Sequence, residues 1–233
     1  MASIIEFKDV VKCFGNQVVL NGLTFTVERG EILAIVGPSG TGKSVTLKHI
    51  VGLEDPDQGE VYVNSKRIGY LFQSGALLAW LTVRENVALP LKETTRLSER
   101  EIDEKVAAAL EAVDLTAAAD KYPSEISGGM QKRAGLARAI VRETEVVLYD
   151  EPTSGLDPVT SVKIHSLIAK LNRERHITSV IVTHDLLGAI KLAHRILLLK
   201  DGKAVLIAKS EDFAKSELKD VKEFLSAMKG DVL

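Results

Sequence analysis

The 233-residue chain contains a single cysteine, Cys13, and only 5% of its residues are aromatic. One cysteine excludes an intrachain disulfide and suits a reducing compartment. No apolar run approaches the roughly 20 residues that a transmembrane helix needs, and the opening MASIIE lacks the basic and apolar regions of a signal peptide. We therefore expect a soluble, cytoplasmic protein.

Neither sign of charge dominates, because 30 Lys and Arg stand against 32 Asp and Glu and give a formal net charge of −2. A net charge this small argues against a broad nucleic-acid footprint. Hydrophobic residues make up 45% of the chain and charged residues 27%. The chain is thus long enough to bury one sizeable core.

One glycine-rich segment, Gly37 to Ser44 with the sequence GPSGTGKS, lies between two informative flanks. The apolar run Glu31 to Val36 predicts a buried parallel strand, and Val45 to Val51 predicts the start of a helix. In that context the glycines let the backbone wrap around a polyphosphate, whose oxygens face free N–H groups. Lys43 then reaches the β- and γ-phosphates, and the Ser44 hydroxyl can ligate Mg²⁺. An accidental glycine-rich turn would not explain these flanks, so we expect a nucleoside triphosphate to bind here.

A second apolar strand, Val146 to Asp150, ends in an acid and is followed at once by Glu151. An acid at the end of a buried strand beside a phosphate loop supplies the counter-charge that Mg²⁺ needs, so Asp150 is predicted on the metal side. Glu151 lies one residue further out, where it can polarise a water that attacks the γ-phosphate, as a general base does. The alternative is a strand that ends in a solvated acidic turn.

Between these two strands, Ser127-Gly128-Gly129 precedes a helix predicted over Lys132 to Arg142, whose alanine-rich composition favours a helix despite Gly135. A serine and two glycines at a helix start offer free N–H groups, a short hydroxyl and the positive end of the helix dipole, all of which suit an anion. The alternative is a simple N-cap, which is the favoured interpretation for these three residues in isolation.

Further local signals outline the rest of the chain. Gly15-Asn16 and Asn21-Gly22 are typical of turns within a strand-rich start, and Asp201-Gly202 is typical of a hairpin. Ser98 and Glu101 form a capping box for a helix whose apolar residues share one face, and a further helix is predicted near Asp220 to Met228. The residues on the shared face are Ile102, Val106, Leu110 and Val113.

The motifs follow one another in the order found in nucleotide-binding subunits of ATP-binding-cassette (ABC) transporters, and the chain resembles that family over nearly all its length. Gly37 to Ser44 resembles Walker A, Ser127 to Gln131 the signature motif, and Val146 to Glu151 Walker B. Ile126 and Met130 depart from the usual Leu-Ser-Gly-Gly-Gln, which removes any polar contact of a glutamine at Met130 but leaves the Ser-Gly-Gly core intact. The remaining matches are Phe14, where an aromatic stacks on adenine, Gln73 as the Q-loop glutamine, Ser154 to Asp157 as the D-loop, and His184 as the switch histidine.

This resemblance implies the fold of an ABC ATPase: an α/β P-loop NTPase core with an N-terminal antiparallel β-subdomain and an inserted α-helical subdomain. One such domain would span residues 1–233. Residues 1–74 and 146–208 would form the nucleotide-binding core with the β-subdomain, residues 75–145 approximately the helical lobe with the signature motif, and residues 209–233 a C-terminal helical tail.

The family's mechanism implies an ATPase that works with a second copy of itself, head to tail, with each ATP held between Walker A of one copy and the signature motif of the other. The triphosphate would supply the differential affinity that such a switch requires. Catalytic roles would fall to Glu151, His184, Gln73 and Lys43, and the cofactor Mg²⁺ would be held by Ser44, Gln73 and Asp150. The predicted nucleotide-binding residues are Phe14, Gly37, Pro38, Ser39, Gly40, Thr41, Gly42, Lys43, Ser44 and Val45, and the contacts to the other copy's nucleotide are Ser127, Gly128, Gly129 and Asp157.

The apolar segment after Gln73, Ser74 to Val83, contains Trp80, the only tryptophan of the chain. One interpretation is that this segment belongs to the core of the helical lobe. The other is that it lines a hydrophobic groove, around Leu77, Leu78 and Trp80, that receives a short coupling helix of the membrane subunit.

Within the superfamily, Phe72 to Leu78, Ser127 to Met130 and Tyr149 to Pro158 together most resemble ATPases of the Mla (Mce-associated) transporters, which move phospholipid between the membranes of Gram-negative cells. That resemblance implies a peripheral place on the cytoplasmic face of the inner membrane, integral membrane permease partners, and a lipid-binding Mce-type subunit. An ATPase of another ABC system, such as lipoprotein release or solute uptake, would share every catalytic motif. A soluble non-transport member acting on DNA or ribosomes would need a long coiled-coil insertion or tandem cassettes, and the sequence has neither.

Overall fold

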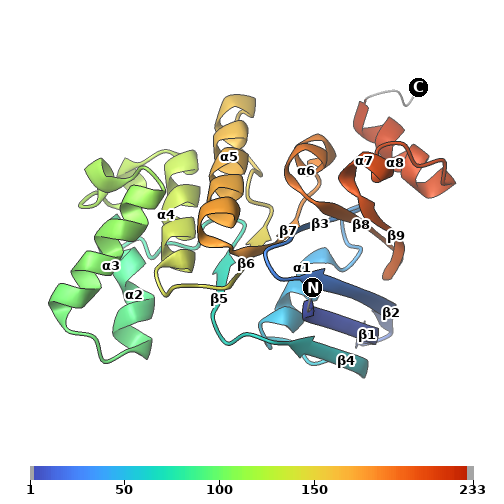
Figure 1. Cartoon of the computed structure of the whole chain (residues 1–233), viewed down its shortest axis with the longest axis horizontal. Helices are drawn as coiled ribbons and strands as arrows, with labels where there is room; N and C mark the ends of the chain where they lie inside the picture. Colours follow the sequence, from blue (N-terminus) through green and yellow to red (C-terminus); the bar gives the residue numbers. More distant parts are fainter. Residues whose placement is uncertain (1–2, 230–233) are drawn as a thin grey trace. The chain divides into compact units, whose positions relative to one another are not determined.

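The structure, a computed structural model, describes residues 3–229, with side chains up to residue 226. The described part divides into two compact units. The first unit comprises residues up to Lys66 together with those from Asn172 onward, and the second unit comprises Arg67–Leu171. Figure 1 colours the first unit blue to teal at its N-terminal part and orange to red at its C-terminal part, and the second unit runs from turquoise through green and yellow to orange.

An antiparallel three-stranded sheet opens the first unit, in the order β2-β1-β4 (Figure 1). Its strands are β1 (Ser3–Phe14), β2 (Gln17–Glu28) and β4 (Gln58–Val63). The predicted turn at Gly15-Asn16 joins β1 to β2 and is confirmed. Phe7 and Phe25 stack across this pair with ring centroids 4.5 Å apart, in the buried face of the sheet.

The turn predicted at Asn21-Gly22 is wrong, because both residues lie within the continuous strand β2. Val10 of β1 pairs with Leu23 and the next residue, Val11, pairs with Asn21, so Gly22 is the extra residue of a β-bulge. Its φ of 73° is accessible to glycine without strain. The glycine that suggests a turn in the sequence therefore bends a strand instead of ending it.

A second sheet of the first unit carries the buried core. Its strands are β3 (Ile32–Val36), β7 (Thr178–Val182), β8 (Arg195–Lys200) and β9 (Lys203–Lys209). β3 pairs in parallel with both β7 and β8, and every residue of β3 and β7 is buried. β9 turns back on β8 through Asp201-Gly202, both at positive φ, which confirms the predicted hairpin. The helices of this unit are α1 (Lys43–Ile50), α6 (Leu186–Leu192), α7 (Ser210–Phe213) and α8 (Lys219–Lys229).

Helices dominate the second unit. Its two parallel strands are β5 (Ile68–Leu71) and β6 (Val146–Asp150). Helix α2 (Val83–Thr94) packs against α3 (Glu99–Ala112) and α4 (Gly128–Ile140), and α4 also packs against β5. Two short 3₁₀ turns, Thr116–Ala118 and Pro123–Glu125, connect α3 to α4, and α5 (Pro158–Arg175) begins in this unit.

The helix predicted from the Ser98–Glu101 capping box is confirmed as α3. The Ser98 hydroxyl accepts the backbone N–H of Glu101, and the Glu101 carboxylate accepts the N–H of Ser98. The apolar face predicted for this helix is buried at all four positions. The predicted helical lobe falls within the second unit, and its boundaries stay a prediction.

Within residues 3–229, no helix combines the length and the apolar character that crossing a bilayer demands.

Candidate nucleotide-binding and hydrolysis site

The phosphate loop lies where the sequence predicts it, between the end of β3 at Val36 and the start of α1 at Lys43. Gly37 has a φ of 154°, and a Cβ at this position would lie 2.1 Å from the carbonyl oxygen of Leu199. Gly42 is the N-cap of α1 with a φ of 97°, and its Cβ would meet Leu20 at 2.7 Å. Only glycine fits either position, because backbone and core side chains approach where a side chain would begin.

The Lys43 side chain folds into this loop. Its Nζ donates to the carbonyl oxygens of Gly37 at 2.9 Å and Pro38 at 2.8 Å, and the residue is only 8% exposed. The Thr41 hydroxyl also donates to the Pro38 carbonyl, at 2.9 Å. A buried ammonium is thus held among backbone groups at the start of α1, where the helix dipole favours an anion.

His184 lies at the same edge of the sheet as the phosphate loop. β3 and β7 run parallel with Ile35 opposite Val182, and the N–H of Thr183 donates to the Ile35 carbonyl. The residues that follow the two strands, Gly37 and His184, therefore leave the sheet side by side. His184 is exposed, and Asp185 after it caps α6 by accepting the N–H of Gly188 at 2.8 Å.

Phe14, the predicted adenine contact, ends β1 with 44% of its surface exposed. The Lys12 ammonium lies 5.4 Å from the centroid of its ring, a cation–π distance. Lys12 is itself anchored, because its Nζ donates to the Asp55 carbonyl at 2.8 Å and forms an ion pair with Asp57. A hydrogen bond from the backbone N–H of Cys13, and after it the Lys12 charge, lower the pKa of Asp57. A cation that is itself held by other contacts thus lies against the aromatic ring.

In the second unit, Asp150 ends β6 and accepts a hydrogen bond from the Tyr70 hydroxyl at 3.2 Å. Burial raises the pKa of Tyr70 above its ordinary value, and the neighbouring Asp150 charge adds to the shift. The phenol therefore stays a neutral donor that orients the carboxylate. Sequence reasoning missed Tyr70; the available signal was its position on β5, three residues before Gln73 and opposite Leu148 of β6.

Glu151, the predicted general base, has a φ of 49°, in the left-handed region that only glycine enters freely. Such a backbone costs about 1 to 3 kcal/mol and persists where surrounding contacts impose it. Here the Glu151 carbonyl accepts the N–H of Ser154 at 3.2 Å and the Lys132 ammonium at 3.1 Å. Gln73 reaches the same turn, since its side-chain amide donates to the Ser154 hydroxyl at 3.5 Å.

Ser127 is the N-cap of α4, and its hydroxyl accepts the N–H of Met130 at 3.3 Å. The N-cap interpretation is therefore confirmed, and the predicted contact with an anion stays a prediction. Ser127 and Gly128 are exposed, and the first turn of α4 carries no acidic residue to neutralise the dipole. Gly129 is buried, and a Cβ there would lie 2.5 Å from Thr160.

Asp157 of the D-loop caps the start of α5. Its carboxylate accepts the N–H groups of Val159 and Thr160, each at 3.0 Å, and the Thr160 hydroxyl at 2.5 Å. The hydroxyl bond first, and then the backbone bond from the same residue, lower the pKa of Asp157. The carboxylate therefore stays ionised through mildly acidic pH.

The structure gathers the predicted residues into two groups. The first unit brings the phosphate loop and His184 to one sheet edge. The second unit links Gln73 to Glu151 through Ser154 and Lys132, while Asp150, next to Glu151 in the chain, accepts a hydrogen bond from Tyr70. His184 and Glu151 belong to different units, and the catalytic roles predicted for them stay predictions.

The donor types predicted for Mg²⁺ are a hydroxyl at Ser44, an amide at Gln73 and a carboxylate at Asp150. These are hard oxygen donors, and Mg²⁺ in nucleotide sites takes one or two of them together with phosphate oxygens and water. Among the described residues, no group of three or more His, Cys, Asp or Glu could hold a metal by itself. The three donor types therefore fit Mg²⁺, and their meeting at one ion stays a prediction.

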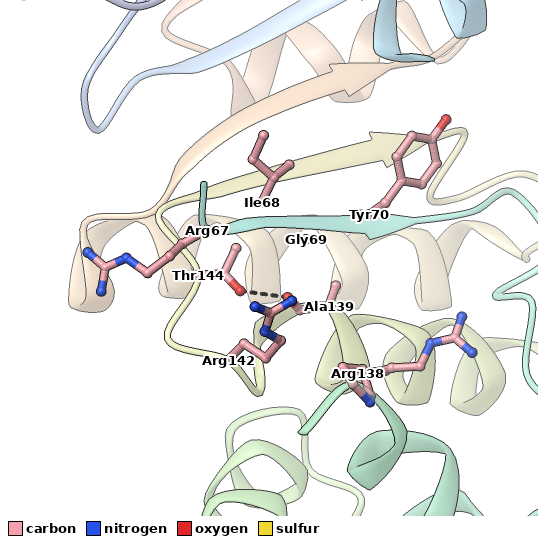
Figure 2. A pocket seen from close by; sticks show the side chains of 9 residues that line it. Arg67, Ile68, Gly69, Tyr70, Arg138, Ala139, Arg142 and Thr144 are labelled. Carbon is pink, nitrogen blue, oxygen red and sulfur yellow. Dashed lines mark hydrogen bonds between the residues drawn. The ribbon is translucent and has the colours of Figure 1, made fainter. Parts of the chain in front are cut away.

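Figure 2 shows the residues that line a cavity of about 140 Å³ in the second unit, among them Tyr70, the partner of Asp150. Two of its three arginines have partners: Arg67 pairs with Glu145, and Arg138 donates to the carbonyls of Gly75 and Ala76. The Thr144 hydroxyl is likewise bonded to the Ala139 carbonyl at 2.7 Å, as Figure 2 shows. We assign this cavity no part in nucleotide binding, because none of the predicted site residues lines it.

Comparison with known proteins identifies the family. Residues 20–154 match the ABC transporter family. The protein TRIGALACTOSYLDIACYLGLYCEROL 3 of Arabidopsis thaliana is 39% identical over 95% of this chain and 73% of its own length. The intermembrane phospholipid transport system ATP-binding protein MlaF of Haemophilus influenzae is 39% identical over 96% of this chain and 90% of its own. A sulfate/thiosulfate import ATP-binding protein of Bradyrhizobium diazoefficiens is 37% identical over 91% of this chain and 65% of its own length.

Among solved structures, the ATP-binding cassette MJ0796, a dimer bound to ADP and Pi in a post-hydrolysis state, superposes with a TM-score of 0.80. It shares 35% identity over 88% of this chain and 98% of its own. The predicted α/β fold of an ABC ATPase, with its antiparallel N-terminal sheet and a core sheet of mostly parallel strands, is thereby confirmed. The residues that match the ABC transporter family make up more than half of this chain. The chain therefore belongs to that family, as an ATP-binding subunit that couples ATP hydrolysis to transport.

Proposed function

We propose that this ATPase drives the transport of phospholipid between bacterial membranes, as the nucleotide-binding subunit of an Mla-type transporter. The observation that carries the proposal is the similarity to MlaF along nearly the whole of both chains. A second candidate, an ABC system with a different cargo such as a solute or a lipoprotein, is favoured by the sulfate/thiosulfate relative at almost the same identity. Cargo is specified by the membrane subunits, so the test must include them.

For the ATPase itself, we assign Lys43 to the β- and γ-phosphates, Glu151 to activation of the attacking water, and His184 to the γ-phosphate. Ser44, Gln73 and Asp150 would hold Mg²⁺, which would supply positive charge against the charge that develops on the phosphates during transfer. The buried, carbonyl-bound ammonium of Lys43 and the hydrogen-bonded carboxylate of Asp150 support these roles.

A second copy of the chain completes the site in this proposal, with Ser127, Gly128, Gly129 and Asp157 facing the other copy's nucleotide. Two observations support this arrangement: the exposed, acid-free start of α4, and the dimeric form of similar cassettes. ATP would then close the pair, because it contacts both copies only in the closed state.

The membrane partner would dock on the loop before α2. Asn86 is fully buried and holds this loop: its Oδ1 accepts the N–H of Leu78, and its Nδ2 donates to the carbonyls of Leu78, Leu81 and Thr82. The loop so fixed displays Trp80 with 72% of its surface exposed, so the lobe-core interpretation is wrong for this residue. Leu77 and Leu78 are half-buried beside it. A rigid loop that presents an indole suits an anchor for a coupling helix.

Docking on a permease would hold the subunit peripherally at the cytoplasmic face of the inner membrane, with a lipid-binding Mce-type subunit elsewhere in the complex. Nucleic acid has no part in the proposal, in keeping with the net charge of −2.

Lys43→Ala should abolish hydrolysis and weaken ATP binding by roughly ten- to a hundredfold, since it removes a cation that bonds charged oxygens. ATPase turnover and a nucleotide titration measure the two effects. Lys48→Ala, an exposed lysine on the same helix, is the matched control and should behave as wild type. Turnover near wild type in the Lys43 variant would contradict the Walker A assignment.

Glu151→Gln should slow hydrolysis by roughly 10² to 10⁴-fold while ATP still binds, because only the base is lost. Size-exclusion chromatography with ATP should then reveal a stable dimer. Glu111→Gln makes the same change at an exposed position of α3 and should leave the rate unchanged. If Glu151→Gln hydrolyses ATP as fast as wild type, the base lies elsewhere, with His184 the first candidate.

Leu78→Asp and Trp80→Asp should each prevent docking of the membrane subunit, since docking would bury an unpaired charge at a cost of about several kcal/mol. Pull-down of the membrane subunit measures docking, and nucleotide titration checks that ATP binding is intact. Leu53→Asp, at another exposed leucine, is the control. Trp80→Asp guards against a folding defect at the half-buried Leu78, and wild-type capture by the Trp80 variant would move the docking surface elsewhere.

The cargo is tested on the intact complex, purified from its native membrane and analysed for bound lipid. We expect co-purified phospholipid and an ATPase rate that rises when the complex is placed in phospholipid vesicles. A complex made with the Glu151→Gln subunit controls for lipid that binds without turnover. Recovery of a solute-import permease without enriched phospholipid would overturn the Mla-type proposal and favour the second candidate.

A further inference from the structure

Lys132 lies on α4, five residues after Ser127, and is 5% exposed. Its ammonium donates to two backbone carbonyls, that of Gln73 and, at 3.1 Å, that of Glu151. These two acceptors lie 59 and 19 residues from Lys132 in the sequence, in the segments that follow β5 and β6. One side chain therefore donates to the backbone of two of the residues proposed above for hydrolysis, Gln73 and Glu151.

Holding a lysine at this place is costly. Burial lowers the pKa of Lys132, although the negative charges of Glu151 and then Asp150 act in the opposite direction. An apolar side chain of similar length would fill the same space without that desolvation cost. Unlike an apolar side chain, the ammonium fixes the position of the two carbonyls to which it donates.

The Glu151 backbone needs such support, since its φ of 49° is strained. The same helix supports two other strained turns in the same way. Arg133 donates to the carbonyls of Val113 and Asp114, and Arg138 to those of Gly75 and Ala76. Asp114 and Ala76 have φ values of 55° and 47°. Each cation of α4 thus holds a left-handed turn, and only Lys132 has Gln73 and Glu151 as its acceptors.

We propose that Lys132 is a positioning residue for ATP hydrolysis, which sets the backbone of Gln73 and Glu151 from the helix that begins with the signature motif. The inference rests on the hydrolytic roles proposed for those two residues. Displacement of a catalytic group by about 1 Å costs roughly a hundredfold in rate. Loss of the ammonium should therefore lower kcat and leave the KM for ATP nearly unchanged, because Lys43 and the phosphate loop do not depend on it.

The test is a double-mutant cycle of ATPase rates on the full chain, with Lys132→Met, Glu151→Gln and the double variant. We expect Lys132→Met to lower kcat roughly ten- to a hundredfold with KM within about twofold. In the Glu151→Gln background the same change should cost little more, because a residue that acts through Glu151 has less left to position. Lys132→Arg, which can still donate to both carbonyls, should recover most of kcat.

Arg133→Met is the matched control. It also removes a cation of α4 that bonds a strained turn, but that turn, at Asp114, contains no proposed catalytic residue. It should lower the melting temperature about as much as Lys132→Met while leaving kcat near wild type. If Lys132→Met does not fold, Lys132→Gln takes its place in the cycle. Equal fold losses in both backgrounds, a raised KM at constant kcat, or equal kcat losses in the Arg133 control would each overturn the proposal. A wild-type rate in Glu151→Gln alone is a different result, which overturns the assignment of the base.

Discussion

The parallel pairing of β3 with β7 is the constraint on which the proposed nucleotide site of the first unit depends. Both strands are completely buried, so their register is fixed by packing on both faces. Because parallel strands end at the same edge, that register delivers the phosphate loop and His184 to one place. Glycine is required at positions 37 and 42, since the core leaves no room for a side chain at either position.

In the second unit, the comparable constraint is the row of cations on α4. Lys132, Arg133 and Arg138 all donate to backbone carbonyls of turns that contain a residue with positive φ. Gly135 lets the helix approach this closely, because a Cβ there would lie 3.0 Å from the carbonyl oxygen of Gly75. The helix that starts with Ser127 is therefore the frame on which the segments after β5 and β6 are shaped.

Hydrogen bonds of a polar side chain also explain why Trp80 is exposed to solvent. The fully buried amide of Asn86 satisfies the backbone of the loop from Leu78 to Thr82, so this loop keeps its form without burying its own apolar side chains. Trp80 remains exposed on a rigid support, which is an arrangement suited to an anchor for another chain. Hydrogen bonding inside the unit thereby leaves an apolar surface available outside it.

The sequence by itself determined what local chemistry specifies: the strand, loop and helix around Lys43, the capping box at Ser98, the hairpin at Asp201-Gly202, and the N-cap at Ser127. Each depends on residues within a few positions of one another. The tertiary structure decided the rest. Asn21-Gly22 signals a turn locally, yet pairing with β1 keeps it in a strand as a bulge. Trp80 is apolar in sequence but exposed, and the partners of Tyr70 and Lys132 lie up to 80 residues away, at distances in the chain that only packing can bring together.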